Sequence, residues 1–300
     1  MHPMAPLVRT FLNAAVRVAP GPAGRLAFHV FVRPLGRARP KPEERAVMAA
    51  ARVGRLRLRS GGDARGKEVV TYEWGDGRRP VLLVHGWSSR ASRLGALAEA
   101  LLARGYSPVA FDAPGHGDSP GRASNIVEYR EIIRELHARH GDFHAVVAHS
   151  FGVLAALFAL RDGVRTARFA GIGAVGSFAF LTAGFRERLG VDERVVRALR
   201  AHVERRIAPD EPGVWHRFEA DHEPEALGAP LLLLHDEDDD MAPPSQSRLL
   251  VRAHGDRARL VVTRGLGHRR ILKDPDVVAR VVEFVTAPAA EPSGERVAAG

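Results

Sequence analysis

The chain has 300 residues, of which 45% are hydrophobic and 26% are charged, a globular composition that excludes wholesale disorder. It has no cysteine and no long uncharged apolar run, which excludes disulfides, thiolate metal sites, a cysteine nucleophile and a transmembrane helix. The net charge of +9 arises in residues 1–66, which hold 13 Lys/Arg and 3 Asp/Glu, whereas the rest is nearly neutral. We find no signal peptide and expect a cytoplasmic protein.

Residues 1–54 are predicted to form a basic helical extension. Two apolar helical faces follow each other until Arg33-Pro34 ends the pattern, and a third helix is expected from Pro42. The first face consists of Leu7, Val8, Phe11, Leu12, Ala15 and Val16, and the second of Leu26, Ala27, Val30 and Phe31. We expect these helices to dock on the body of the protein, and we expect no nucleic-acid partner. The alternatives are a peripheral membrane contact or a dimer contact.

From residue 55 the pattern changes to strands that alternate with helices. Leu56 and Leu58 alternate with arginines, as on a half-exposed edge strand, and a second strand is expected over Glu68–Trp74. The later strands are apolar runs typical of parallel strands buried on both faces: Val81–Val84, Pro108–Phe111, Ala145–Ala148, Phe169–Val175, Leu231–Leu234 and Leu260–Val262. The helices expected between and after them are Ser92–Arg104, Ile126–Arg139, Phe151–Arg161, Pro244–Ala253 and Asp276–Thr286. This alternation predicts an α/β fold, a mostly parallel central sheet with helices on both faces.

One connection in this sheet is too long for a loop. The 55 residues between Val175 and Leu231 contain apolar positions at helical spacing. We therefore predict a helical cap over 177–225, above the carboxyl edge of the sheet. The α/β core then comprises 55–176 and 226–287, and the tail 288–300 is predicted to be disordered.

The strongest chemical signal is Ala148-His149-Ser150-Phe151-Gly152, which lies between a buried strand and an apolar helix. A nucleophile elbow requires this strand–turn–helix context, because the tight turn holds the serine hydroxyl clear of the sheet. The residues on both sides must be small, since strand and helix approach closely there. Gly152 meets this demand, and Ala148 stands where glycine is usual. Ser150 is therefore the candidate nucleophile.

A serine hydroxyl becomes nucleophilic when a base accepts its proton and an acid orients that base. An acidic loop follows the penultimate strand, and His268 follows the last strand. Both loops are expected at the carboxyl edge of the sheet, where they can reach Ser150. The sequence therefore predicts His268 as the base. The candidate acids are Asp236, Asp238, Asp239 and Asp240.

Together these motifs resemble the α/β-hydrolase family over about Val69 to Val285. The matching stretches are Val84-His85-Gly86-Trp87, the run from Phe111 to Ser119, the elbow, the acidic loop and Gly267-His268. Several are similar to those of bacterial hydrolases without an assigned substrate. The resemblance implies an α/β-hydrolase fold and a Ser-His-Asp triad, but no substrate. In the family the acid lies three residues after the glycine that closes the strand and four before a proline, which selects Asp239, with Asp238 second.

The backbone N–H groups of Trp87 and Phe151 are the predicted oxyanion hole, because Gly86 lets its loop bend and Phe151 follows the nucleophile. The predicted substrate pocket consists of Trp87, His149, Phe178, Phe180, Leu181 and Phe185. Other polar residues have structural explanations. We expect His85, His116, Asp112 and Asp118 to brace loops, and His235 to hydrogen-bond the acidic loop. The acids of that loop other than Asp239 are expected to be solvated. Arg269 and Arg270 are expected to lie on the surface.

The sequence therefore predicts a serine hydrolase that cleaves small-molecule carboxylic esters through an acyl-enzyme, without a cofactor or a metal. The same triad would also serve an acyltransferase or a thioesterase. A catalytically inactive binding protein on the same scaffold is the alternative from another class, and it would usually have lost a triad member. The sequence carries no signal for an oligomeric state.

Overall fold

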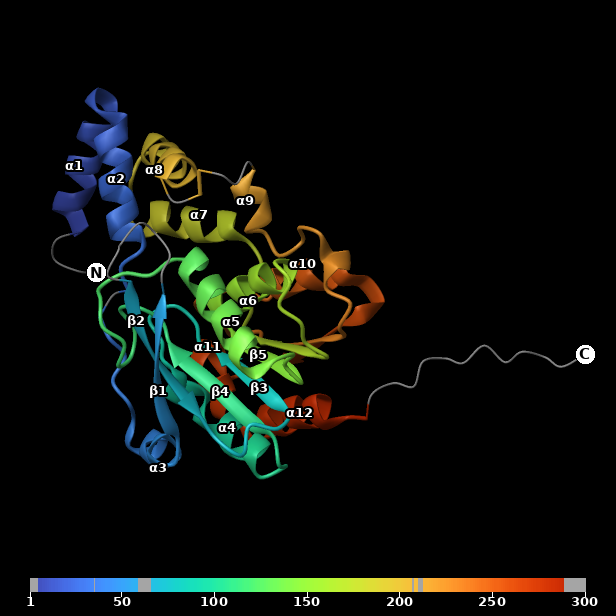
Figure 1. Cartoon of the computed structure of the whole chain (residues 1–300). Coiled ribbons are helices and arrows are strands. Elements are labelled where there is room, and N and C mark those ends of the chain that lie inside the picture. The colour runs from blue at the N-terminus through green and yellow to red at the C-terminus, as the bar shows by residue number, and fades with distance from the viewer. Residues whose placement is uncertain (1–4, 35, 59–65, 207, 210–212, 289–300) are drawn as a thin grey trace, which may run out of the picture.

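A mostly parallel sheet forms the centre of the molecule, which confirms the prediction from the buried apolar runs (Figure 1). The computed structural model describes residues 5–34, 36–58, 66–206, 208–209 and 213–288. Within them the strand order is β1-β2-β4-β3-β5-β6-β7-β8, and only the pairs β1–β2 and β2–β4 are antiparallel. The strands are β1 (Arg52–Leu58), β2 (Lys67–Glu73), β3 (Pro80–Val84), β4 (Ser107–Asp112), β5 (Ala145–His149), β6 (Phe169–Ile172), β7 (Leu231–Asp236) and β8 (Ala258–Thr263).

Most strand bounds agree with the sequence pattern, and two departures are informative. β1 is an edge strand whose Leu56 and Leu58 are buried while its arginines are exposed, as their alternation predicts. β6 ends at Ile172, three residues before the predicted end, because Gly173 adopts a positive φ of 54° and the chain leaves the sheet. β7 instead continues two residues past its predicted end, to Asp236. Both departures lie at the carboxyl edge.

Helices cover both faces of the sheet. One face packs against α5 (Ile126–His140), α6 (Phe151–Arg161) and α10 (Ser245–His254), and the other against α3 (Arg45–Ala49), α4 (Gly95–Leu102) and α12 (Pro275–Thr286). These two apolar layers bury most of the core and hold the strand ends in place. The shorter helical turns are η1 (Pro42–Glu44), η2 (Ala91–Leu94), η3 (Pro224–Ala226), η4 (Gly255–Arg257), α11 (Gly267–Arg270) and η5 (Ile271–Lys273).

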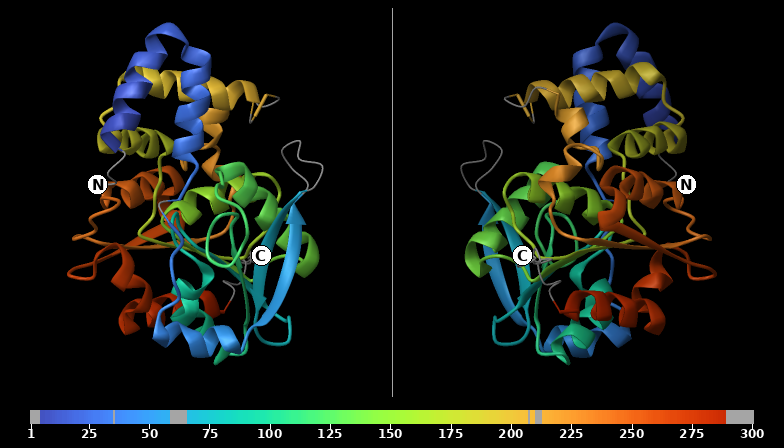
Figure 2. Two further views of the ribbon diagram at one scale, coloured as in Figure 1. Left: turned by 90° about the vertical axis from the view of Figure 1, so that its left-hand side faces the viewer. Right: turned by 90° about the vertical axis from the view of Figure 1, so that its right-hand side faces the viewer.

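A separate helical layer lies above the carboxyl edge (Figures 1 and 2). The chain between β6 and β7 supplies α7 (Phe178–Leu189), α8 (Glu193–Arg206) and α9 (Val214–Arg217), and the N-terminal segment supplies α1 (Ala5–Val18) and α2 (Pro20–Phe31). α2 crosses α8 so closely that a Cβ at Gly24 would lie 2.2 Å from the carbonyl oxygen of Ala198. The N-terminal hairpin therefore docks on the inserted helices. Of the predicted tail, residues 289–300 lie outside the described residues.

The apolar face predicted for the first helix is divided in the structure. Leu12 and Val16 are buried against the rest of the protein, whereas Leu7 and Phe11 are 64% and 60% exposed. Val8 and Ala15 are partly buried against the same core, so docking uses four of the six predicted positions and leaves Leu7 and Phe11 to solvent. Among the described residues, no helix is long and apolar enough to cross a membrane.

Candidate active site

The turn between β5 and α6 holds Ser150 in a strained backbone conformation. Its φ of 55° and ψ of −125° lie in a region that non-glycine residues avoid, at a cost of about 1–3 kcal/mol. The surrounding backbone is packed too tightly for larger residues. A Cβ at Gly152 would lie 2.7 Å from the carbonyl oxygens of Val84 and His85, and one at Gly86 would lie 2.8 Å from the Cβ of Ser150. The elbow therefore depends on glycine at both positions.

A hydrogen-bond chain leads from Ser150 to the acidic loop. The Ser150 Oγ lies 2.9 Å from His268 Nε2, and His268 Nδ1 lies 2.7 Å from Asp239 Oδ2. The His268 side chain is 7% exposed and that of Asp239 is 1% exposed. The three side chains come from the carboxyl ends of β5, β7 and β8, which the sheet brings together. The geometry is that of a serine, a base and an orienting acid.

Asp239 is held on both carboxylate oxygens. Oδ1 accepts hydrogen bonds from the backbone N–H groups of Met241, at 2.9 Å, and Ala242, at 2.8 Å. Oδ2 faces His268, and His235 Nε2 lies 3.4 Å away from it. Burial alone would raise the pKa of Asp239, but the hydrogen bonds from His235, His268 and Ala242 lower it below its ordinary value. The carboxylate is therefore charged and fixed in one orientation.

The other acids of this loop divide into two kinds. Asp238 and Asp240 are exposed, and the Asp238 carboxylate turns away from His268 to accept from the Gly265 N–H. The expectation of a solvated side chain is wrong for Asp236, which is fully buried. Its carboxylate accepts from the Thr263 hydroxyl and from three backbone N–H groups, two of which belong to the residues immediately before His268. Because β7 continues to residue 236, this side chain points into the protein and not into solvent.

Trp87 and Phe151 lie close to the serine, since Phe151 follows it in the chain and Gly86, which precedes Trp87, lies against the Ser150 side chain. Phe151 opens α6, where the first N–H groups have no partner within the helix. The Trp87 and Phe151 rings contact each other edge to face, with centroids 5.4 Å apart, so the two residues lie side by side. Within the described residues, neither N–H has a hydrogen-bond acceptor. Two adjacent unused donors beside a serine can stabilise a developing oxyanion.

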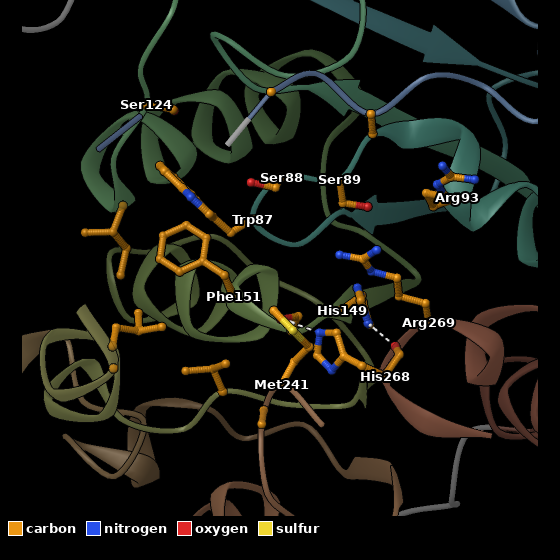
Figure 3. Close-up of a pocket in the computed structure, with 18 of the residues that line it drawn as sticks. Trp87, Ser88, Ser89, Arg93, Ser124, His149, Phe151, Met241, His268 and Arg269 are labelled. Atoms are coloured by element: carbon orange, nitrogen blue, oxygen red, sulfur yellow. Dashed lines mark hydrogen bonds between the residues drawn. The ribbon is translucent and has the colours of Figure 1, made fainter. Parts of the chain in front are cut away.

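His149 supports the histidine rather than the serine. It is buried, its Nε2 donates to the carbonyl oxygen of His268 at 3.0 Å, and the two rings lie 4.6 Å apart (Figure 3). Burial, and after it the neighbouring charge of His268, lowers the pKa of His149 to about 3. The side chain therefore stays neutral near pH 7 and fixes the backbone that carries His268, besides lining the cavity.

Buried polar side chains brace the loops, as expected. His85 Nδ1 donates to the Gly86 carbonyl oxygen at 2.7 Å, and His85 Nε2 accepts from the Ala113 N–H at 3.0 Å. The buried Asp112 accepts from the N–H groups of Ala91 and Asp118, both at 2.8 Å. His235 bonds the Ala242 carbonyl oxygen at 2.8 Å, on the acidic loop. These contacts fix the two loops that approach Ser150.

A cavity of about 1160 Å³ opens onto Ser150 and His268. The predicted pocket residues Trp87, His149, Phe178, Phe180, Leu181 and Phe185 all line it. Arg269 and Arg270 are both exposed, as expected. Arg269 also lines the cavity, and Arg270 donates to the Gly265 carbonyl oxygen. Within the described residues, no group of three or more acidic or histidine side chains is placed to hold a metal ion.

The sequence did not predict that α2 contributes to this cavity. Phe28 and Phe31 line it, and the Phe31 ring lies 5.3 Å from that of Phe185 and 6.0 Å from that of Phe178. Their helical spacing indicates an apolar face but does not identify what the face covers. The N-terminal segment and the insertion thus share one apolar wall.

Comparisons with known proteins agree with this architecture. A sequence model of a protein family, described as "Alpha/beta hydrolase family", matches residues 81–281. No curated protein matches the chain.

Among similar solved structures, a monoacylglycerol lipase of Paleococcus ferrophilus has 24% sequence identity and a TM-score of 0.56, and the match covers 72% of this chain and 98% of the lipase. An esterase of Pyrococcus furiosus has 17% identity and a TM-score of 0.61, covering 86% of this chain and 98% of its own. An esterase from Rhodococcus sp. ECU1013 has 20% identity and a TM-score of 0.59, covering 79% of this chain and 99% of its own. At these identities the likeness shows the fold.

Proposed function

This chain belongs to the alpha/beta hydrolase family, and from that premise we propose that it is a serine hydrolase that cleaves carboxylic esters through an acyl-enzyme. The observation that carries the proposal is the hydrogen-bond chain from Ser150 through His268 to Asp239, which begins at a strained elbow. A serine hydroxyl is a weak nucleophile, and a hydrogen bond to a histidine that can accept its proton activates it. The esterases and the lipase among the similar structures support the same reaction class.

Acylation begins when the Ser150 Oγ attacks the acyl carbon of the ester and its proton passes to His268 Nε2. Asp239 stabilises the resulting imidazolium through its 2.7 Å contact with Nδ1. The negative charge on the former carbonyl oxygen is stabilised by the N–H groups of Trp87 and Phe151, each contributing about 3 kcal/mol to lowering the barrier. The tetrahedral intermediate collapses as the ester C–O bond breaks, and the alcohol leaves with the proton from His268.

Deacylation repeats these steps with water as the nucleophile. His268 accepts a proton from the water as its oxygen attacks the acyl carbon. The bond to Ser150 then breaks, the carboxylic acid leaves, and the proton on His268 returns to the Ser150 oxygen. The reaction needs no redox partner, because no atom changes its oxidation state.

The apolar wall of the cavity favours a substrate with an aliphatic or aromatic acyl group. Phe178 and Phe185 are buried and Phe180 and Leu181 are half-buried, all facing the cavity that holds Ser150. Each methylene of an acyl chain buried there contributes about 0.8 kcal/mol to binding. Esters with longer acyl chains should therefore bind more tightly until the cavity is filled.

The test is a series of p-nitrophenyl esters from acetate to palmitate, hydrolysed by the purified full-length chain. We expect hydrolysis with an optimum beyond acetate, lost in Ser150→Ala and retained in Ser89→Ala, a matched change of another serine that lines the cavity. The absence of hydrolysis with every ester, or equal activity of the Ser150→Ala variant, would contradict the proposal.

A further inference from the structure

The outer side of α1 carries an apolar stripe that the rest of the described chain leaves uncovered. Leu7, Phe11 and Val18 recur at intervals of four and seven residues, which places them on one side of the helix. They are 64%, 60% and 88% exposed, and Leu26 on α2 is also exposed. Large apolar side chains exposed singly are ordinary on protein surfaces, but several along one helix indicate an interaction surface.

The helix that carries this stripe and the two helices packed on it are basic. The helices α1, α2 and α8 together carry eight arginines and two glutamates. Both glutamates are already engaged, since Glu193 pairs with Arg186 and Glu204 accepts from the Trp215 indole N–H. Burial, and after it the positive charge of His29, Arg205, Arg206 and Arg25, lowers the pKa of His202. The three helices thus form a basic end of the molecule, which Figure 2 shows far from α4 and α12.

α2 also lines the cavity, and α8 contributes Val203, whereas none of the described residues of α1 lines it. Phe28 and Phe31 face the cavity that contains Ser150, while Leu26 on the same helix is exposed. α2 therefore has one side on the apolar cavity, while Leu26, 37% exposed, lies on its solvent side next to α1. A substrate that arrives from an apolar phase at this surface would have a short path to Ser150. This step depends on the proposed function, whereas the surface itself does not.

We propose that α1, α2 and α8 form a docking surface for an anionic lipid bilayer, from which ester substrates with long acyl chains enter the cavity. Leu7, Phe11 and Val18 would lie in the interfacial region of the bilayer, and the arginines would contact the anionic headgroups. A second copy of this chain fits less well, because a twofold contact would bring two arginine clusters together. A nucleic acid fits less well too, since the stripe would face a phosphate backbone.

The docking surface is tested by binding of the full-length protein to vesicles, measured by co-sedimentation. Vesicles of phosphatidylcholine alone are compared with vesicles that contain about 30% phosphatidylglycerol. We expect binding at least about tenfold tighter to the anionic vesicles, and weaker when the salt concentration is raised. The double variant Arg17→Gln/Arg25→Gln should lose about fivefold in affinity for each arginine.

The apolar stripe is tested by the double variant Leu7→Ala/Phe11→Ala, which we expect to weaken vesicle binding at least about tenfold. Leu7, Phe11, Arg17 and Arg25 are all exposed, so both double variants should keep the unfolding temperature of the parent protein. The matched controls are Val53→Ala, 59% exposed on β1, and Arg78→Gln, exposed in the turn after β2. Both controls should bind vesicles like the parent. Equal binding to both vesicle types, or no difference between the variants and the controls, would overturn the proposal.

Two further measurements separate this proposal from the others. Vesicle binding is repeated with Ser150→Ala, so that failure of the protein to hydrolyse any ester leaves the docking result intact. Hydrolysis by the Leu7→Ala/Phe11→Ala variant is then measured on soluble p-nitrophenyl acetate and on a long-chain ester embedded in vesicles. We expect a loss with the embedded ester alone. A dimer in solution that this variant dissociates, without vesicle binding by the parent, would assign the surface to a second copy.

Discussion

Replacing Asp239 by asparagine should abolish most of the activity for a reason that can be worked out from its contacts. Asp239 Oδ1 accepts hydrogen bonds from the N–H groups of Met241 and Ala242, so the amide oxygen of an asparagine must take that place. Its NH₂ group would then face His268 Nδ1, which must accept instead of donate. The proton of the imidazole would therefore sit on Nε2, which faces Ser150 and could no longer accept the serine proton.

The expected loss is about 10⁴ in kcat, equivalent to about 5.5 kcal/mol of transition-state stabilisation. KM should change little, because Asp239 does not line the cavity. The assay is steady-state hydrolysis of p-nitrophenyl butyrate, with circular dichroism to verify folding. Asp240→Asn, at an exposed position of the same loop, serves as the matched control and should keep kcat within about twofold. A larger loss in Asp238→Asn than in Asp239→Asn would refute the reasoning.

Three further predictions concern the serine, the cavity and the behaviour in acid. Ser150→Ala and His268→Ala should each abolish ester hydrolysis, and the double variant should be hardly slower than either single variant in initial-rate assays. Phe180→Ala or Leu181→Ala should shift the acyl length at which p-nitrophenyl ester hydrolysis is fastest, while kcat/KM on the acetate ester falls less than about tenfold. If neither variant changes this optimum, the acyl group binds elsewhere. Because the pKa of His149 is about 3 in the folded protein and about 6.5 when unfolded, the unfolded state binds the extra proton, and stability falls as the pH drops from 6.5 towards 3. In the His149→Phe variant the free energy of unfolding should fall less steeply with decreasing pH, by up to about 1.4 kcal/mol per pH unit, as measured by urea titrations at several pH values. An unchanged pH dependence would contradict this prediction.

The sequence predicted the core of the fold because buried parallel strands produce continuous apolar runs. It also indicated where Ser150, Asp239 and His268 meet, since parallel strands carry the residues that follow them to a common edge. The choice of Asp239 depended on counting from the family pattern, and the structure places Asp239 on His268 and Asp238 away from it. Its assignment as the catalytic acid stays a prediction until the variants are measured.

The sequence did not predict contacts that depend on how distant segments pack. Asp236 belongs to an acidic run that looks solvated, and its burial follows only from the two extra residues of β7. The apolar pattern of the first helix cannot tell that Leu12 is buried and Phe11 exposed. Likewise, nothing in the local spacing around Gly24 indicates that it lies against Ala198 in another helix. Periodicity identifies an apolar face but not its partner.

The assignment of Ser150 as an activated nucleophile is tested most directly by mass spectrometry of the protein after reaction with a fluorophosphonate, which modifies activated serines. We expect one added label per chain, located by peptide mapping on Ser150, and no label in the His268→Ala variant because the hydroxyl is no longer activated. Labelling of another serine, or equal labelling of Ser150 with and without His268, would contradict the assignment of Ser150 as a nucleophile activated by His268.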